Sequence, residues 1–372
     1  MRIYGITGTN GKTTTTWILD TFLGGGGYVT TVEANTGRRR FSTGYTTPPL
    51  SVLKEIFAEM EAAGCSTCVM EVSSHAIHQR RTGDTVFAGG GFTNLTEDHL
   101  DYHKTMEAYF QVKTDFFRRL AVSTPGAPAA ICVDGEYGRR LAEICRALPL
   151  RTIECGLSVE GGIQDTQAPQ DYKDLKDLIG RKCPLVGRYN VQNVLVAAAL
   201  ALGAGVPLDD IVAKIPLLVP RWGRLERVAT RSAADVFVDY AHTDDALANV
   251  LSTVREFTKG KVWAVFGAGG DRDRAKRPLM GAAAAANADR LVVTSDNPRS
   301  EDPLSIIGQI VAGIPAGTDF VTEPDRAAAI RYALANAAAG DTVVVCGKGH
   351  ETTQTIGDKI IHFDDRETCA QY

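Results

Sequence analysis

The sequence predicts an α/β protein of two domains, each built on a mostly parallel sheet covered by helices, and two observations lead to this prediction. Short apolar, β-branched runs recur along the 372 residues and alternate with helical segments, which is typical of parallel sheets. The segment 215–223 carries two prolines and a glycine soon after a long helix rich in alanine and leucine, as domain boundaries often do. We therefore expect one domain over residues 1–221 and a second, Rossmann-like domain over 222–372.

The expected elements follow from these runs in order. An apolar strand over 3–7 starts the chain, a helix over 14–22 follows it, and the glycines 24–27 predict the end of that helix and a loop. A helix is also expected over 190–202, after a polar segment, 156–186, whose weak periodicity predicts a small meander. The other strands are expected at 68–72, 85–92, 129–133, 236–240, 262–266, 291–295 and 343–346.

The composition argues against several classes of protein. With 44% hydrophobic residues, 23% charged residues and a net charge of -4, the chain resembles soluble globular proteins and lacks the basic surface expected for binding nucleic acid or membranes. It has no apolar run of about 18 residues, and its first residues are typical of a core strand rather than a signal segment, so we expect a cytoplasmic location. The eight cysteines are scattered, and Cys65 and Cys68 are expected in a buried strand as small apolar residues rather than in a metal or redox site.

A phosphate-binding loop is predicted between the first strand and the first helix. A loop of this kind points backbone N–H groups and a helix N-terminus at phosphate oxygens. Lys12 supplies a positive charge, and the Thr13 hydroxyl can ligate Mg²⁺. The strict pattern has a glycine where Ile6 stands, so the motif is met approximately. The residues expected to hold nucleotide here are Gly8, Thr9, Asn10, Gly11, Lys12, Thr13 and Thr14.

Polar residues follow two further strands of the same predicted sheet. Glu71 ends one apolar strand, and the segment 96–103 (Thr-Glu-Asp-His-Leu-Asp-Tyr-His) follows another. Ligands of open α/β sheets bind at the carboxyl ends of the strands. These oxygen and imidazole groups, together with Thr13, therefore predict a Mg²⁺ site beside the phosphate loop.

The glycine-rich segment 267–273 invites comparison with a dinucleotide fingerprint. Its G-x-G-x-x-G spacing is incomplete, and no acidic residue on a well-formed second strand supports that interpretation. Hydrolase motifs are also incomplete, because the segment 73–75 lacks G-x-S-x-G, and His99 with His103 lacks the glutamate of H-E-x-x-H.

Six motifs in order along the chain resemble those of the Mur ligase family, and most closely its MurE type, whose members add the third residue of the peptidoglycan stem peptide to UDP-N-acetylmuramoyl-L-alanyl-D-glutamate. The motifs are residues 8–14, 70–75, 92–103, 187–193, 239–243 and 347–351. The resemblance covers nearly the whole chain. It implies an ATP-dependent amide-bond ligase that works in cell wall biogenesis.

The resemblance also implies roles for residues around the nucleotide. Lys12 and Thr13 would hold the β- and γ-phosphates and one Mg²⁺, and Glu71 and His99 would help to ligate a second metal ion. Lys113 stands where the family has a lysine carbamylated by CO₂, which turns a cation into an anionic oxygen ligand; a free lysine that contacts the γ-phosphate is the alternative. The positions that match ATP contacts are Asn193, Arg224 and His242.

Two substrate pockets are implied as well. The muramoyl-peptide acceptor would be held by Thr46, Thr47, Ser73, Gln79 and Arg81. The incoming amino acid would be held by Arg272, Asp296, Asn297, Arg299, Gly347 and Glu351. Arg299, in Asp-Asn-Pro-Arg, suits meso-diaminopimelate, because a guanidinium pairs with its distal carboxylate and would meet like charge on a lysine substrate.

Family members normally begin with a domain that binds the uridine diphosphate group, whereas this sequence starts at the strand before the phosphate loop. A truncation, a separate UDP-binding domain or subunit, and a smaller acceptor without UDP remain open explanations. Other open alternatives are a folylpolyglutamate synthetase, against which Asp-Asn-Pro-Arg counts, and a non-catalytic nucleotide-binding subunit. We expect a monomer that acts on small-molecule substrates.

Overall fold

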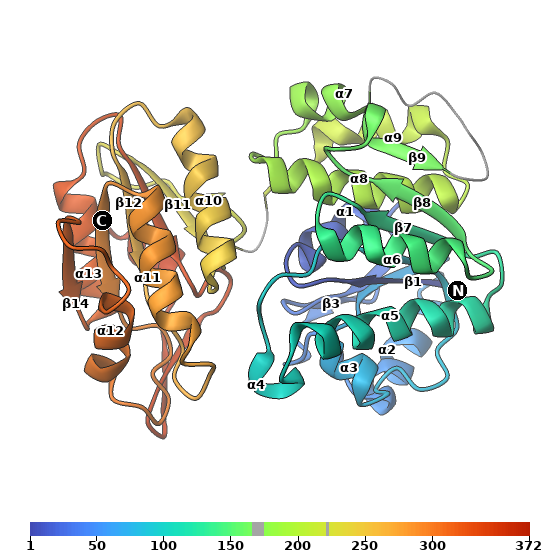
Figure 1. Cartoon of the computed structure of the whole chain (residues 1–372), viewed down its shortest axis with the longest axis horizontal. Coiled ribbons are helices and arrows are strands. Elements are labelled where there is room, and N and C mark those ends of the chain that lie inside the picture. Colours follow the sequence, from blue (N-terminus) through green and yellow to red (C-terminus); the bar gives the residue numbers. More distant parts are fainter. Residues whose placement is uncertain (166–174, 221–222) are drawn as a thin grey trace. The chain divides into compact units, whose positions relative to one another are not determined.

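The computed structural model describes residues 1–165, 175–220 and 223–372, and the chain divides into two compact units, Met1–Val219 and Pro220–Tyr372. Both units are α/β, which confirms the predicted fold class (Figure 1). No helix in the described part of the chain is long and apolar enough to cross a bilayer.

The described strands of the first unit form one nine-stranded sheet in the order β4-β3-β2-β5-β1-β6-β7-β8-β9. The central strands are parallel, and β3, β4 and β9 run antiparallel to their neighbours. The strands are β1 (Arg2–Thr7), β2 (Gly27–Val29), β3 (Ala34–Asn35), β4 (Arg40–Phe41), β5 (Thr67–Glu71), β6 (Phe87–Phe92), β7 (Pro128–Cys132), β8 (Arg151–Cys155) and β9 (Ile163–Asp165). Because β1 lies between β5 and β6, the segments that follow these three strands meet at one edge of the sheet.

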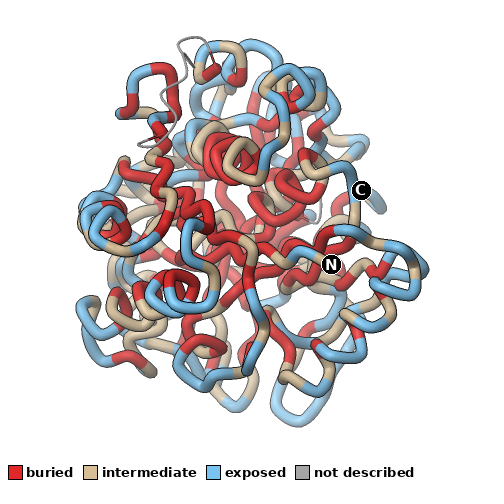
Figure 2. The backbone as a smooth tube through the Cα atoms, turned by 90° about the vertical axis from the view of Figure 1, so that its right-hand side faces the viewer, coloured by how far each residue is buried: buried red, intermediate tan, exposed pale blue. Residues whose placement is uncertain are grey.

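Helices cover both faces of this sheet, and Figure 2 shows that its centre is buried whereas the outer turns are exposed. The helices α1 and α8 pack on each other and on the sheet, while α5 packs on β6 and α6 on β7. The helices are α1 (Lys12–Phe22), α2 (Leu50–Ala62), α3 (Ser74–His78), α4 (Leu100–His103), α5 (Met106–Ser123), α6 (Glu136–Arg146), α7 (Leu175–Lys182), α8 (Arg188–Gly203) and α9 (Leu208–Lys214), with short 3-10 turns η1 (Glu160–Gly162) and η2 (Ile215–Leu217).

Glycines in β6 bring helices close to both faces of the sheet. A Cβ atom on Gly90 would lie 2.7 Å from Phe116 in α5, and one on Gly91 would lie 3.2 Å from Val196 in α8. A larger residue at either position would push these elements apart. The short separation is what lets Lys113 of α5 reach the residues that follow β1.

The second unit has a six-stranded sheet in the order β10-β11-β15-β12-β13-β14, parallel apart from β10. Helices α10, α11 and α12 pack on one face of the sheet, and α13 and α14 cover the other. The strands are β10 (Glu226–Arg227), β11 (Asp235–Asp239), β12 (Val262–Phe266), β13 (Arg290–Thr294), β14 (Phe320–Glu323) and β15 (Thr342–Cys346), with a separate hairpin of β16 (Thr353–Ile356) and β17 (Lys359–His362). The helices are α10 (Asp244–Phe257), α11 (Lys276–Asn287), α12 (Pro303–Val311), α13 (Arg326–Asn336) and α14 (Asp365–Ala370).

Several predicted details are wrong. The segment 156–186 is not a meander throughout, because it contains η1, β9 and the helix α7, while residues 166–174 lie outside the described part of the chain. Cys65 precedes β5 and is half-buried, whereas Cys68 is buried within the strand as expected. Burial raises the pKa of the Cys68 thiol, which keeps it unreactive.

Candidate functional site

The phosphate loop (residues 8–14) adopts a conformation that depends on its two glycines. Gly11 has φ of 84° at the start of α1, and a Cβ atom there would lie 2.2 Å from Oδ1 of Asn193 in α8. A Cβ on Gly8 would lie 1.9 Å from Thr93 Oγ1. The loop therefore passes close to two neighbouring segments and turns its backbone into the N-terminus of α1. Such a narrow turn matches a cradle for phosphate oxygens.

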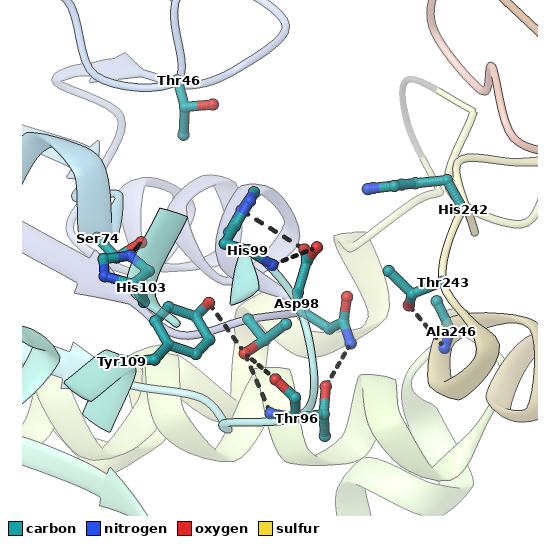
Figure 3. A network of polar contacts seen from close by, with 12 residues as sticks. Thr46, Ser74, Thr96, Asp98, His99, His103, Tyr109, His242, Thr243 and Ala246 are labelled. Atoms are coloured by element: carbon teal, nitrogen blue, oxygen red, sulfur yellow. Dashed lines mark hydrogen bonds and ion pairs between the residues drawn. The ribbon is translucent and has the colours of Figure 1, made fainter. Parts of the chain in front are cut away.

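Residues after β6 hold this loop from one side, and Figure 3 shows one of them, Thr96. The Asn10 N–H donates to Asn94 Oδ1 at 2.9 Å, and the Thr93 hydroxyl donates to the Asn10 carbonyl at 2.6 Å. The Thr9 hydroxyl lies 3.1 Å from the Thr96 N–H and 3.2 Å from the Tyr109 hydroxyl. Asn94 and Thr96 lie within the motif 92–103 but were given no role of their own there, whereas Tyr109 was missed, because a helical tyrosine carries no signal of its own in a single sequence.

Two lysines converge on the Gly8 carbonyl. Lys12 Nζ donates to the carbonyls of Gly8 and Thr9 at 3.1 and 2.7 Å, and Lys113 Nζ donates to the Gly8 carbonyl at 2.8 Å. Lys113 is 1% exposed, and its Nζ also lies 4.7 Å from the centre of the Tyr109 ring. Burial, and then the charge of Lys12, lower the pKa of Lys113 well below its usual value, which favours the neutral amine.

Glu71 ends β5 directly beside the phosphate loop. Its carboxylate accepts hydrogen bonds from the Thr13 hydroxyl at 2.7 Å and from the Thr31 N–H at 2.8 Å. Its side chain is 1% exposed, and within the described residues no lysine, arginine or histidine forms an ion pair with it. A buried carboxylate held only by neutral donors favours a bound cation. Hydroxyl and carboxylate oxygens are the ligand types that Mg²⁺ takes.

The other predicted metal ligand, His99, lies on the segment after β6. It has φ of 56°, just before α4, and its side chain faces Asp98, with Nε2 3.5 Å from Asp98 Oδ2. Burial lowers the pKa of His99 to about 4 against the opposing charge of Asp98, so its imidazole is neutral at physiological pH and able to bind a metal. In the described part of the chain no hydrogen bond joins His99 to Glu71, and no group of three histidine, cysteine or acidic side chains has metal-binding geometry.

The predicted acceptor residues lie at the same edge of the sheet and form two groups. Thr47 donates to the Glu71 carbonyl at 2.9 Å and accepts from the Ser73 N–H at 3.0 Å. Arg81 donates to Gln79 Oε1 at 2.8 Å, and Gln79 in turn donates to the Tyr102 hydroxyl. Tyr102 was not predicted as an acceptor residue. Thr46 precedes Thr47 on a loop and is labelled in Figure 3. Its hydroxyl oxygen lies 3.0 Å from the hydroxyl oxygen of Thr31.

Asn193 joins the nucleotide site from α8. Its Oδ1 accepts a hydrogen bond from the Thr15 hydroxyl at 3.3 Å, and its Nδ2 donates to Asn190 Oδ1 at 3.2 Å. These bonds fix the amide against the first turn of α1, next to Gly11. The first unit therefore brings Glu71, Lys113 and Asn193 into contact with the phosphate loop or the first turn of α1.

In the second unit, the residues predicted for the amino acid gather after β12, β13 and β15. Asn297 Nδ2 donates to Glu351 Oε2 at 2.8 Å. Arg299 is half-buried and donates to the Gly270 carbonyl at 2.6 Å, so it lies against the glycine-rich turn. A Cβ atom on Gly269 would lie 2.9 Å from Arg299 Nη1 and 3.5 Å from Arg272 Cγ. Arg272 and Arg299 thus flank the same turn.

Two buried charges that the sequence did not single out support this group. Arg326 is paired with Asp365, with Nε 2.7 Å from Oδ1, and it donates to the carbonyls of Ser295 and Cys346. These bonds connect the ends of β13 and β15, where Asp296 and Gly347 follow. Gly347 has φ of 120°, and a Cβ atom there would lie 2.4 Å from Asp296 Oδ2.

Lys348 is the second missed charge. It is fully buried, and its Nζ lies 3.1 Å from Glu351 Oε2 and 3.4 Å from Asn297 Oδ1. Lys348 therefore fixes the orientation of two residues predicted to hold the amino acid, rather than facing a ligand itself.

Arg224 and His242 meet at Tyr240, which follows β11. The Arg224 guanidinium carbon lies 4.6 Å from the centre of the Tyr240 ring, and His242 Nδ1 is 2.9 Å from the Tyr240 carbonyl oxygen. His350, which was missed, packs on the same ring, and burial and the charge of Arg224 lower its pKa to about 3. Thr243 caps α10 by accepting from the Ala246 N–H at 3.2 Å (Figure 3).

The fold and these two groups of residues define a class: an α/β protein with a phosphate-binding loop at the carboxyl edge of one parallel sheet and a second polar site at the carboxyl edge of another. Comparison with protein families then places the chain within this class. Residues 6–201 match the Mur ligase middle domain, and residues 223–349 match the Mur ligase glutamate ligase domain. The chain belongs to the Mur ligase family and is an ATP-dependent ligase.

Relatives along the whole chain agree with this assignment. The chain is 43% identical over 388 residues to the UDP-N-acetylmuramoyl-L-alanyl-D-glutamate–2,6-diaminopimelate ligase of Synechococcus sp. (strain WH7803), covering 100% of this chain and 77% of that protein. It is 44% identical to the enzyme of the same name from Solibacter usitatus, covering 99% of this chain and 76% of that protein.

Solved structures share the fold. One with the same enzyme name is 31% identical, with a TM-score of 0.59, and covers 99% of this chain and 77% of that chain. A pseudomurein peptide ligase from Methanothermus fervidus has a TM-score of 0.65 at 16% identity and covers 94% of this chain and 76% of that chain, so it supports the fold alone.

Proposed function

We propose that this chain ligates meso-diaminopimelate to UDP-N-acetylmuramoyl-L-alanyl-D-glutamate, with ATP converted to ADP and phosphate. The observation that carries the proposal is the similarity of 38 to 44% identity to enzymes of that name along essentially the whole chain. The placement of Arg299 beside the glycine-rich turn supports the choice of amino acid. The reaction would contribute to peptidoglycan synthesis, and its dependence on ATP suits the cytoplasm.

The first unit would bind ATP and the acceptor. Phosphate oxygens would accept hydrogen bonds from the N–H groups of the phosphate loop and from Lys12. To reach the phosphate, Lys12 would leave the carbonyls of Gly8 and Thr9 to which it donates. Mg²⁺ would be held by Thr13 and Glu71, with His99 as a ligand of a second ion, and it would neutralise charge on the transferring phosphoryl group. Asn193 in this unit, and Arg224 and His242 in the second, would contact the rest of the nucleotide.

Lys113 would react with CO₂ in its neutral form to give a carbamate. Its burial and lowered pKa provide the neutral amine that this reaction needs. The carbamate would offer anionic oxygens in place of an ammonium group, next to the charge of Lys12.

The chemistry needs no protein nucleophile. A carboxylate oxygen of the acceptor attacks the γ-phosphorus of ATP, the bond to ADP breaks, and an acyl phosphate forms. The neutral amine of the amino acid then attacks the acyl carbon, phosphate leaves, and an amide remains after loss of a proton. The protein contributes positioning and charge neutralisation, for which Lys12 is the main side chain of this unit.

Each substrate has a set of side chains with suitable chemistry. Thr46, Thr47, Ser73, Gln79 and Arg81 offer hydroxyl, amide and guanidinium donors to an acceptor that carries carboxylates. In the second unit, Arg272 and Arg299 would bind carboxylate, while Asp296, Asn297, Gly347 and Glu351 would bind amino and carboxylate groups. The chain would act as a monomer, with residues 1–221 as the ATP-binding domain and 222–372 as the amino-acid-binding domain.

The test is ADP release over a matrix of substrates. Muramoyl-dipeptide acceptors with and without UDP are combined with diaminopimelate, lysine or glutamate. Turnover that requires both the UDP-linked acceptor and diaminopimelate is expected. Equal turnover with acceptors that lack UDP would support a smaller natural acceptor instead, and no turnover with any pair would support a non-catalytic nucleotide-binding subunit.

A further inference from the structure

Thr31 lies between Glu71, the proposed metal ligand, and Thr46, a proposed acceptor residue. Its backbone N–H donates to Glu71 Oε1 at 2.8 Å, and its hydroxyl oxygen lies 3.2 Å from Glu71 Oε2. The same hydroxyl oxygen lies 3.0 Å from Thr46 Oγ1. One side chain therefore touches both the carboxylate that favours a cation and a hydroxyl of the acceptor group.

The single proton of the Thr31 hydroxyl can serve only one of these contacts at a time. When Thr31 donates to Glu71, the contact with Thr46 persists only if Thr46 donates its own proton to Thr31. When Thr31 donates to Thr46 instead, the Thr46 proton is available to a ligand. Whether the Glu71 carboxylate accepts the Thr31 proton therefore decides whether the Thr46 hydroxyl is available to donate a hydrogen bond to an acceptor.

A cation on Glu71 changes this balance. The cation draws electron density from the carboxylate and weakens the hydrogen bonds that the carboxylate accepts. The Thr31 proton then turns toward Thr46, and Thr46 can donate to an anionic oxygen. Hydrogen bonds to a carboxylate are stronger than those between neutral groups, so an acceptor that carries carboxylates gains from this change.

We propose that Thr31 is a positioning residue whose hydroxyl competes with the metal ion for Glu71 and transmits metal binding to Thr46 by reversing the direction of one hydrogen bond. The acceptor half of this inference rests on the proposed function, whereas the metal half requires only a divalent cation at Glu71. Because binding linkage is reciprocal, the metal ion and the acceptor should tighten each other by the same factor.

Three variants separate this role from a general effect of the substitution. Thr31→Val keeps the shape and the backbone N–H but removes the hydroxyl, and Thr31→Ser restores it. Thr67→Val is the matched control: Thr67 begins β5, the strand that ends in Glu71, and its buried hydroxyl has no hydrogen-bond partner among the described residues. Thr46→Val removes the hydroxyl to which Thr31 would donate when the metal ion is bound.

The experiment measures Mn²⁺ affinity by electron paramagnetic resonance with a non-hydrolysable ATP analogue bound, with and without UDP-N-acetylmuramoyl-L-alanyl-D-glutamate. Without acceptor, Thr31→Val should bind Mn²⁺ about 5- to 20-fold more tightly, because the hydroxyl that competes with the ion for Glu71 is absent; this lies within the usual range of coupling factors. Thr31→Ser and Thr67→Val should match the wild type. The acceptor should tighten Mn²⁺ several-fold in the wild type, and by a factor of about one in both Thr31→Val and Thr46→Val.

Two results would overturn the role of Thr31: a Mn²⁺ affinity in Thr31→Val equal to or weaker than that of the wild type, or an equal gain in Thr67→Val. If Thr31→Val does not fold, as shown by its melting curve, retained coupling in Thr46→Val overturns the transmission to Thr46. A failure of the proposed function looks different. The wild type would then show no effect of the acceptor on Mn²⁺, while the difference between wild type and Thr31→Val would persist and still decide the metal half.

Discussion

The two candidate sites are held in different ways. In the first unit, short side chains and main-chain groups fix the phosphate loop and Glu71, and Glu71 and Lys113 are each 1% exposed. In the second unit, the residues expected to choose the amino acid include the long side chains of Arg299, which is half-buried, and Arg272, which is exposed. A rigid phosphate site suits chemistry that every member of a ligase family shares, while longer and more exposed side chains can adapt to one amino acid.

Breaking the first site should have the largest effect. Lys12→Ala removes the charge that the loop offers to phosphate, and we expect the rate of ADP release to fall about 10³-fold or more. The melting temperature should stay within about 2 °C of the wild type, since Lys12 is only partly buried.

The matched control for this variant is Lys54→Ala, an exposed lysine of α2. Its rate should equal that of the wild type. If Lys12→Ala released ADP as fast as Lys54→Ala in the presence of both substrates, the chain would not be an ATP-dependent ligase of the proposed kind.

Breaking the second site should change selectivity more than rate. Arg299→Ala removes the guanidinium proposed to pair with the distal carboxylate of diaminopimelate, so KM for diaminopimelate should rise about 10- to 100-fold with a smaller change in kcat. KM for lysine should change little or fall, because a like charge is removed. Steady-state kinetics with both amino acids measure the ratio of KM for diaminopimelate to KM for lysine.

Arg331→Ala, an exposed position on α13, is the control for loss of an arginine from this unit. An unchanged ratio of the two KM values in Arg299→Ala would assign Arg299 to the structure of the glycine-rich turn and not to substrate selection.

The smallest effect, on stability rather than turnover, concerns the rigid site itself. Burial lowers the pKa of Lys113 well below 10.5, so between the lowered value and 10.5 the unfolded chain binds one more proton than the folded chain. The stability of the wild type therefore rises with pH through this window and falls as pH decreases. Lys113→Met lacks this dependence and should be about 1 kcal/mol more stable than the wild type near pH 7 in CO₂-free buffer, although inactive.

Urea unfolding at several pH values tests this prediction. The advantage of Lys113→Met over the wild type should shrink as the pH rises toward 10.5. An advantage that is constant with pH would contradict the lowered pKa of Lys113. A variant less stable than the wild type at pH 7 would show that Lys113 stabilises the fold through its hydrogen bond to Gly8 rather than costing free energy by its burial.

Periodic apolar runs predicted the fold class and the strands with the clearest signal. The strand over 262–266 was located to the residue, as β12. The two-residue strands β3 and β4 escaped, because they are too short to show alternation and depend on pairing with β2. The edge strand β14 was not predicted for a related reason. Its four residues alternate between exposed and half-buried, and two of them, Thr322 and Glu323, are polar, so the strand shows no apolar run. The segment before α8 contained a helix that its weak periodicity did not reveal.

The candidate sites were predictable where motifs carry chemistry and not where tertiary contacts do. Glu71 was predicted from a motif at the end of a strand, and Lys113 from its position in the family resemblance. Thr31, Tyr109 and Arg326 were missed because their importance lies in partners that are distant in sequence, such as Asp365 for Arg326. A threonine or tyrosine has the same local sequence signal whether or not it touches a buried carboxylate or a loop.

Lys12 donates hydrogen bonds to two carbonyls of its own loop, and a ligand that binds Lys12 must compensate for the loss of these bonds. A ligand with several oxygens can meet Lys12 and the N-terminus of α1 together, whereas chloride or a single carboxylate offers fewer contacts to replace these bonds. The resting position of Lys12 therefore favours polyphosphates over small anions.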